Sequence, residues 1–259
     1  MNGQDLIMKF DELLDLTRAS YATFAEQTER AIAEQRPMVL AVDEENIDAE
    51  KFQLDVALLK AAPIAAVPMH SAFHPLQEPG HRFLLAADGL YLEVRRPWLY
   101  FIHRLAEHTS VRIPYGAIAP KVELAFGQLG TALDQMREFA VHAMEAAPLE
   151  SAASLIWNSN LKQWSMKLPK VIGEATADRI QYEQVDLAED GSESIAMDLH
   201  SHGHAAAFFS APDDADDAGS VKIAGVFGNL DQNMPTVAFR LCVLGLYLPI
   251  QVPAEKIFG

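Results

Sequence analysis

The chain has 259 residues, half of them hydrophobic, which is enough for one large domain or two ordinary ones. It carries 20 Lys and Arg against 36 Asp and Glu, and the formal net charge of −16 argues against binding to a nucleic-acid backbone as the main activity. A basic partner would be compatible with this charge. The single cysteine, Cys242, allows no intrachain disulfide and suits a reducing cytoplasm.

Nothing in the sequence predicts membrane insertion or secretion. The N-terminus lacks a basic region followed by an apolar region, so we expect no signal peptide. The longest apolar run, residues 236–250, is too short to span a membrane and contains Arg240. We interpret this run as a buried strand, in which Cys242 is an inert core thiol rather than a catalytic nucleophile.

The N-terminal part is predicted to be a small α+β region, residues 1–125, without a recognised catalytic motif. Residues 11–35 have helical composition, and residues 36–80 are irregular and rich in proline, with short apolar runs at 38–42 and 61–67. Asp88-Gly89 is a strong turn signal and predicts a hairpin of residues 82–87 and 90–94. Residues 98–108 are interpreted as a short amphipathic helix. Three histidines of this region are interpreted as loop residues, with a second metal site as the alternative: His70, His74 and His81.

The second part, residues 130–259, has a more regular pattern. Apolar residues at helical spacing predict a helix over 131–147. Apolar runs then predict strands at 151–157 and 163–168 joined by a turn, a second strand pair at 180–185 and 195–200, and strands at 221–227 and 237–248. The fold class expected for the whole chain is α/β (α+β), with a mixed sheet and flanking helices preceded by the smaller N-terminal region.

A pair of histidines at the end of one predicted strand is the strongest functional signal. Residues i and i+2 of a strand face the same side, so His200 and His202 can hold one metal ion while Ser201 points away. Two histidines and one carboxylate leave a fourth zinc position open, which is typical of hydrolytic rather than structural zinc. His202 and His204 form a second pair of the same spacing, and His204 is interpreted as a loop or rim residue.

The third ligand is expected at the start of a short helix. Ser210 is predicted to be its N-cap with Asp213 at N3, an arrangement resembling a capping box that would hold Asp213 rigidly. The alternative is that Ser-x-x-Asp is only a common helix start, and that the histidines lie in a loop without metal. The neighbouring acids are interpreted as solvated: Asp214, Asp216 and Asp217.

The pattern H-S-H-x7-S-x2-D over residues 200–213 resembles the signature of the JAMM (MPN-plus, Mov34/JAB) metallopeptidases. The resemblance covers residues 130–259 and implies the JAMM fold, with one Zn²⁺ per chain held by His200, His202 and Asp213. It assigns the general base to Glu150, in a Pro-x-Glu context that resembles the family's, and it assigns stabilisation of the oxyanion to Ser210.

The chain departs from the family pattern at two places. Ala152-Ala153 stands where a Cys-Gly or similar pair is usual, and Gly203 stands where proline commonly follows the second histidine. We expect Gly203 to alter loop stiffness rather than ligation. Glu145 is the nearest rival to Glu150 as the base, although it is predicted to lie on the preceding helix.

Within this family, the chain resembles the protein A group of bacterial PRTRC cassettes, on the runs 198–210, 225–230 and 240–245. These cassettes encode relatives of ParB and of ThiF-type (E1-like) activating enzymes. The resemblance implies a zinc peptidase or isopeptidase acting on a ubiquitin-like or sulfur-carrier protein, with neither nucleic acid nor membrane as a partner. Two alternatives stay open: a catalytically silent scaffold of the same fold, and a zinc hydrolase that trims a small group from a carrier protein.

Overall fold

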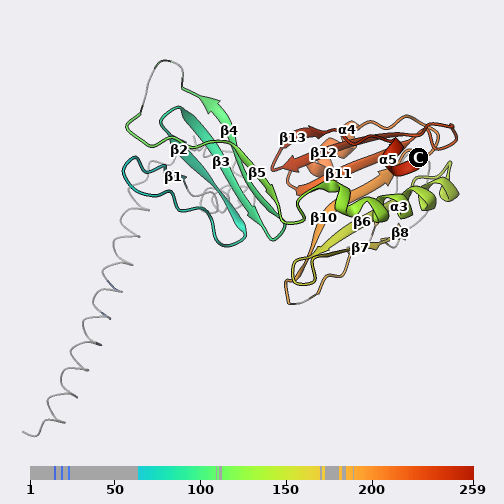
Figure 1. Cartoon of the computed structure of the whole chain (residues 1–259), viewed down its shortest axis with the longest axis horizontal. Coiled ribbons are helices and arrows are strands. Elements are labelled where there is room, and N and C mark those ends of the chain that lie inside the picture. The colour runs from blue at the N-terminus through green and yellow to red at the C-terminus, as the bar shows by residue number, and fades with distance from the viewer. Residues whose placement is uncertain are drawn as a thin grey trace, which may run out of the picture. The chain divides into compact units, whose positions relative to one another are not determined.

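The computed structural model describes residues 64–108, 110, 113–169, 171–172, 181–182, 185–188 and 190–259, together with Asp15, Ala19 and Thr23. These last three residues are helical, as predicted for residues 11–35; the rest of that helix and the apolar run 38–42 lie outside the described residues. The sheets and the remaining helices belong to one compact unit, Ala61–Gly259 (Figure 1).

The first sheet has five strands in the order β1-β2-β3-β4-β5. Its strands are β1 (Ile64–Ala66), β2 (Gly80–Ala86), β3 (Gly89–Arg96), β4 (Leu99–Glu107) and β5 (Lys121–Leu124). β1 runs parallel to β2, and the remaining neighbours are antiparallel. The hairpin predicted around Asp88 is confirmed, because Ala86 pairs with Gly89. His81 lies in β2, so the loop prediction is wrong for this one histidine.

Residues 98–108 form a central strand, so the amphipathic helix predicted there is wrong. β4 pairs with β3 on one side and with β5 on the other. Its first half, Leu99–Ile102, is buried on both faces. Because these residues are buried on both faces, the segment lacks the alternation of apolar and polar residues that identifies a strand. Its aromatic and β-branched residues nevertheless favour a sheet.

The second sheet has six strands in the order β13-β12-β11-β10-β6-β7. Its strands are β6 (Ala152–Asn158), β7 (Gln163–Lys167), β10 (Glu193–Ser201), β11 (Val221–Gly228), β12 (Thr236–Val243) and β13 (Leu246–Ile250). A two-stranded sheet, β8 (Val171–Ile172) with β9 (Gln181–Tyr182), is separate from it. The helical elements are η1 (Leu129–Ala132), α3 (Leu133–Ala146), α4 (Ala211–Asp217) and α5 (Glu255–Phe258).

Most of the predicted elements of this region are confirmed, with two differences in pairing. β9 pairs with β8 rather than with β10, which lies between β6 and β11. The run 237–248 is a hairpin and not one strand, because Leu244 and Gly245, at φ 49° and 90°, turn the chain back on itself. Positive φ at both central residues is the geometry of a tight hairpin turn, but leucine is an unusual residue there and gave no signal.

The connection from β10 to β11 determines where the site lies. These two strands are parallel, so the chain must cross from the end of β10 back to the start of β11, and α4 lies in this crossover. β10 is antiparallel to β6 on its other side, with His200 opposite Ala152. The carboxyl end of β10 therefore carries His200, the loop after it and the first turn of α4. α/β sheets commonly bind ligands at the carboxyl ends of their strands.

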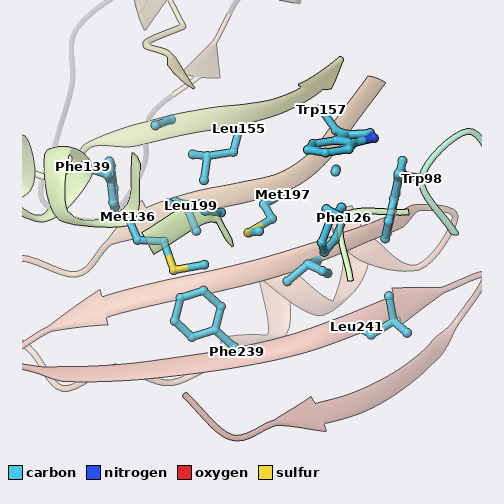
Figure 2. Packing of buried hydrophobic residues seen from close by; sticks show 14 of the residues in the cluster. Trp98, Phe126, Met136, Phe139, Leu155, Trp157, Met197, Leu199, Phe239 and Leu241 are labelled. Carbon is cyan, nitrogen blue, oxygen red and sulfur yellow. The ribbon is translucent and has the colours of Figure 1, made fainter. Parts of the chain in front are cut away.

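One hydrophobic core joins α3 to the six-stranded sheet. Figure 2 shows Met136 and Phe139 of α3 packed near Leu199 and Phe239 of the sheet. The same cluster includes residues of the five-stranded sheet, among them Leu99 and Phe101, while the other face of that sheet has a smaller cluster around Tyr91. Two sheets of mixed pairing with few helices make an α+β fold, as predicted.

Candidate metal centre

His200 and His202 converge at the carboxyl end of β10. His200 is the penultimate residue of the strand and His202 is the first residue after it. Their Nε2 atoms lie 3.2 Å apart. Ser201 points to the opposite side, where it is fully buried and bonds to Ser151, as the two-residue periodicity predicts.

Asp213 is fixed by the capping box at the start of α4, which confirms this part of the prediction. Its Oδ2 accepts hydrogen bonds of 2.6 Å from both the backbone N–H and the hydroxyl of Ser210, while its own N–H donates to the Ser210 Oγ at 3.4 Å. Because Oδ2 is occupied in this way, Oδ1 is the oxygen that faces the histidines. It lies 3.4 Å from the Nε2 atom of His200.

In its neutral form, His202 directs the lone pair of its Nε2 toward His200 and Asp213. Its Nδ1 lies 3.3 Å from the carbonyl oxygen of Ala206, which can only accept, so Nδ1 carries the proton. In the neutral ring Nε2 is then unprotonated and available to a metal. The ring is also held by Phe208, whose centroid lies 4.8 Å away in an edge-to-face contact.

Burial favours the neutral form of His200 as well. Desolvation lowers the pKa of His200, and the positive charge that His202 can carry adds to this, while the Asp213 carboxylate opposes both. The side chain nevertheless keeps 26% of its surface exposed, so a substrate can reach it. A neutral imidazole is the form that ligates metals.

The spacing of the three groups fits a zinc ion. His200, His202 and Asp213 each offer one ligand atom, and these atoms all lie within 4.8 Å of one another. Zinc bonds of about 2.0–2.1 Å in a tetrahedron place neighbouring ligand atoms about 3.3 Å apart, close to the two separations of 3.2 and 3.4 Å found at His200. The set of two nitrogens and one oxygen also leaves a fourth position for a water or a substrate.

Glu150 lies beside this cluster. It lies two residues before β6, and it lines a cavity of about 570 Å³ whose wall also includes His200 and Asp213. The next residue, Ser151, donates its backbone N–H to the Ser201 Oγ at 3.0 Å, and Ser201 returns a backbone bond of 2.9 Å to the Ser151 carbonyl. These bonds connect the residue after Glu150 to the residue between the two histidines.

Gly203 has a larger role than the loop stiffness we expected. Its φ is +53°, a value that proline cannot adopt, and a Cβ at this position would lie 2.5 Å from the carbonyl oxygen of Pro148. Only glycine lets the loop after His202 approach the segment that leads into Glu150. Glycine in place of the family's proline therefore permits this close backbone contact.

The rival residues lie elsewhere. His204 is exposed in the loop and is not part of the cluster, and Glu145 is exposed on the last turn of α3, as predicted. Asp214 and Asp216 are exposed, but Asp217 is only 4% exposed, so the prediction that it is solvated is wrong.

Asp217 belongs to a buried ionic network that local sequence patterns do not predict. Lys222 lies 2.8 Å from its Oδ1, and Arg240 donates to its Oδ2 at 2.7 Å. Arg240 also bonds to Asp214 and lies between the rings of Phe209 and Tyr247, 3.8 and 4.1 Å from their centroids. The network anchors the helix that carries Asp213 to β11 and β12. In the sequence, the only sign of this network is the charged residue Arg240 within the apolar run 236–250.

Comparisons with known protein families divide the chain in two. Residues 133–242 match the family of prokaryotic homologs of the JAB domain, and residues 52–125 match a domain of unknown function (DUF2016). No curated protein matches the chain. Among the described residues, no helix is long and apolar enough to cross a membrane.

The first match contains every residue of the candidate centre, from Glu150 to Asp213. It is independent of the side-chain geometry described above and leads to the same fold class. Residues 133–242 of this chain are thus similar to the JAB domains of prokaryotes.

Proposed function

We propose that the chain is a zinc-dependent peptidase or isopeptidase, with one Zn²⁺ held by His200, His202 and Asp213. The observation that carries the proposal is the convergence of two imidazole nitrogens and one carboxylate oxygen at the carboxyl end of β10. A zinc ion bound there would act as a Lewis acid on a carbonyl and lower the pKa of a water to roughly 7.

Glu150 is the proposed general base. A base must be close to the reacting water, and Glu150 shares its cavity with two of the proposed ligands. It would accept the proton of the attacking water and pass this proton to the amine that leaves. The bonds between Ser151 and Ser201 would hold its backbone at a constant distance from the histidines.

Ser210 is proposed to stabilise the developing oxyanion, in competition with its role as a cap. Its hydroxyl donates to Asp213 at 2.6 Å, and a hydroxyl has a single proton to donate. To reach a substrate oxygen the hydroxyl must rotate, after which Asp213 would still be held by the Ser210 backbone N–H. Ser210 would thus exchange one hydrogen-bond acceptor for another during turnover.

The proposed substrate is a ubiquitin-like or sulfur-carrier protein, joined or extended at its C-terminus, in a cassette of the PRTRC type. This part rests on the resemblance to protein A of such cassettes, which also encode ThiF-type activating enzymes and so suggest an E1-like partner. The net charge of −16 favours a protein partner over nucleic acid. The single cysteine suits the reducing cytoplasm that we propose as the compartment.

Two other functions compete with this one. A silent scaffold of the same fold would have no need for a carboxylate beside three converging ligand groups, and the position of Glu150 therefore favours an enzyme. A zinc hydrolase that trims a small group from a carrier protein would use the same residues, and only its substrate would distinguish it.

The test combines metal content with cleavage. Zinc is measured by elemental analysis in the wild type, His202→Ala and Asp213→Ala, and cleavage is followed with ubiquitin-like and sulfur-carrier proteins that carry C-terminal extensions. We expect one zinc in the wild type and almost none in the two variants. Glu150→Gln should keep the metal and lose about 10²–10⁴-fold in rate.

Glu145→Gln is the matched control, because it makes the same chemical change at an exposed position on α3. It should behave as the wild type does. Full activity in Glu150→Gln would show that another group is the base. A wild type that binds zinc but cleaves none of the carrier fusions would favour the scaffold.

A further inference from the structure

The loop that follows β10 presents one peptide group to the candidate metal centre. This group is the trans peptide between Ala206 and Ala207, and both of its polar atoms have partners. Its carbonyl oxygen lies 3.3 Å from the Nδ1 atom of His202, and its N–H donates to the hydroxyl oxygen of Thr236 at 3.1 Å. The C=O and N–H of a planar trans peptide point in opposite directions, so His202 and Thr236 lie on opposite sides of one rigid group.

Thr236 belongs to the sheet and not to the loop that it contacts. It is the first residue of β12, where it pairs with Gly228 at the end of β11. Its Oγ1 atom also accepts a hydrogen bond of 3.3 Å from the side-chain amide of Asn229. A hydroxyl oxygen has two lone pairs, so it can accept from both donors at once. The hydroxyl is therefore a fixed point against which the loop peptide is oriented.

Other contacts determine the path of the loop but not the orientation of this peptide. The backbone N–H of Asn229 donates to the Ala205 carbonyl at 2.6 Å. The loop also passes so close to Gly228 that a Cβ there would lie 2.3 Å from the backbone nitrogen of Ala207. Neither contact is a hydrogen bond of the peptide between Ala206 and Ala207. Loss of the Thr236 hydroxyl would thus leave the loop in place and release the rotation of this one peptide.

The orientation of the peptide matters because it determines which tautomer of His202 is favoured. A carbonyl oxygen facing Nδ1 requires a proton on Nδ1 and leaves Nε2 with a lone pair that faces His200 and Asp213. A peptide rotated by half a turn would present its N–H instead. That N–H would favour the opposite tautomer, whose Nε2 carries the proton and cannot ligate a metal.

We infer that Thr236 is a positioning residue of the candidate metal centre. Through the peptide between Ala206 and Ala207, its hydroxyl holds the His202 ring in the tautomer whose Nε2 is available. The inference deepens the proposed function and rests on it, because it takes His202 to be a metal ligand. Thr236 comes from β12 and acts through the loop, so no pattern near the two histidines identifies it.

The test replaces the hydroxyl with a methyl group of similar size, in Thr236→Val. Long-range proton–nitrogen NMR of the full, nitrogen-labelled and metal-free chain reports the tautomer at about pH 8.5, where imidazoles are ordinarily neutral. His202→Ala assigns the signals. We expect the tautomer with the proton on Nδ1 alone in the wild type and a mixture of both in Thr236→Val. Competition with a coloured chelator should show a zinc Kd that is weaker by about tenfold in Thr236→Val.

Three further variants control for packing and folding. Thr236→Ser keeps the hydroxyl and should have the wild-type tautomer and zinc affinity. Thr131→Val makes the same chemical change in η1, where the hydroxyl accepts from the Trp164 indole at 3.0 Å, and it should alter neither readout. If circular dichroism shows that Thr236→Val does not fold, Thr236→Ala replaces it with the same expected results.

The inference would be overturned if Thr236→Val kept either the single tautomer or the zinc affinity of the wild type. It would also be overturned if Thr236→Ser lost as much as Thr236→Val, since the methyl group and not the hydroxyl would then matter, or if the wild type carried its proton on Nε2. A wild-type chain that binds no zinc would refute the proposed metal centre. The tautomers of the metal-free chain would then decide this inference by themselves.

Discussion

Two polar clusters, one in each large sheet, differ in how completely their hydrogen bonds are satisfied. Glu93 of β3 is fully buried, and both of its carboxylate oxygens have partners: Oε1 accepts from Tyr100 and from the backbone N–H of Leu76, and Oε2 accepts from Arg82. At the end of β10, by contrast, two imidazoles and a carboxylate converge with few donors between them.

The difference distinguishes a structural cluster from the candidate metal centre. The Glu93 cluster is complete, and it attaches the loop before β2 to the sheet, since Arg82 also donates to the His74 carbonyl at 2.6 Å. Burial and the neighbouring Glu93 raise the pKa of Tyr100, so its hydroxyl remains a donor. The His200 cluster directs lone pairs toward a common point, and the zinc ion that we propose there would complete it.

The largest effect is expected from breaking the complete cluster. Arg82→Met would leave a buried carboxylate without its cation, and we expect the free energy of unfolding to fall by about 3–5 kcal/mol. Urea denaturation measures this change. The double variant Arg82→Met/Glu93→Gln should recover part of the loss, while zinc content stays at the wild-type value. A small loss in the single variant would mean that Glu93 is not held mainly by its ion pair.

Zinc binding at the His200 cluster should have the next largest effect. Free zinc at a hundredfold excess over its Kd should raise the free energy of unfolding by about 2.7 kcal/mol. Asp213→Asn should abolish this gain, and Asp216→Asn, an exposed acid on the same helix, should retain it. Thermal melts with and without zinc make the comparison. Equal stabilisation of both variants would place the ion elsewhere.

A smaller effect should follow from adding a side chain at Gly203, where the backbone passes close to Pro148. Gly203→Ala adds a Cβ against the Pro148 carbonyl as well as strain at positive φ, and we expect about 1–3 kcal/mol of destabilisation together with weaker zinc binding. Gly191→Ala is the control, since Gly191 has a φ of +70° with nothing within 4 Å of the added atom. If the two variants lose the same stability, the contact with Pro148 contributes nothing.

The smallest effect concerns Cys242. Burial raises the pKa of its thiol to about 12, so the reactive thiolate is scarce at pH 8 and a disulfide reagent should not modify the folded chain. In the unfolded chain the pKa returns toward 9.0, so any stability linked to this group is present below pH 9 and declines as the pH rises toward 12. Rapid modification at pH 8 without denaturant would contradict the buried position.

The parts of the site that depend on local sequence were predictable. The facing of His200 and His202 follows from strand periodicity, and the capping box follows from the spacing of Ser210 and Asp213. Parts that depend on long-range packing were not predictable. Asp217 appeared to be a solvated acid because its partners, Lys222 and Arg240, reach it only after β11 and β12 have paired with the rest of the sheet.

The fold shows the same division. The hairpin at Asp88-Gly89 has a strong turn signal and was found, whereas the turn at Leu244-Gly245 lacks one and was missed. β4 was mistaken for a helix because its burial depends on two neighbouring strands, which its own sequence does not identify.

The crossover from β10 to β11 confines the three candidate ligands to residues 200–213. Glu150 comes instead from the segment before β6, where the bond from Ser151 to Ser201 spans 50 residues. Closing the short segment costs little chain entropy, so capture of the proposed ion would need only β10 and its crossover helix to form. The proton transfer that we propose for Glu150 would in addition need β6 to pair. Loss of Glu150 alone would leave the three candidate ligands and the sheet in place, and this would be a short evolutionary route from the proposed hydrolase to a metal-stabilised scaffold.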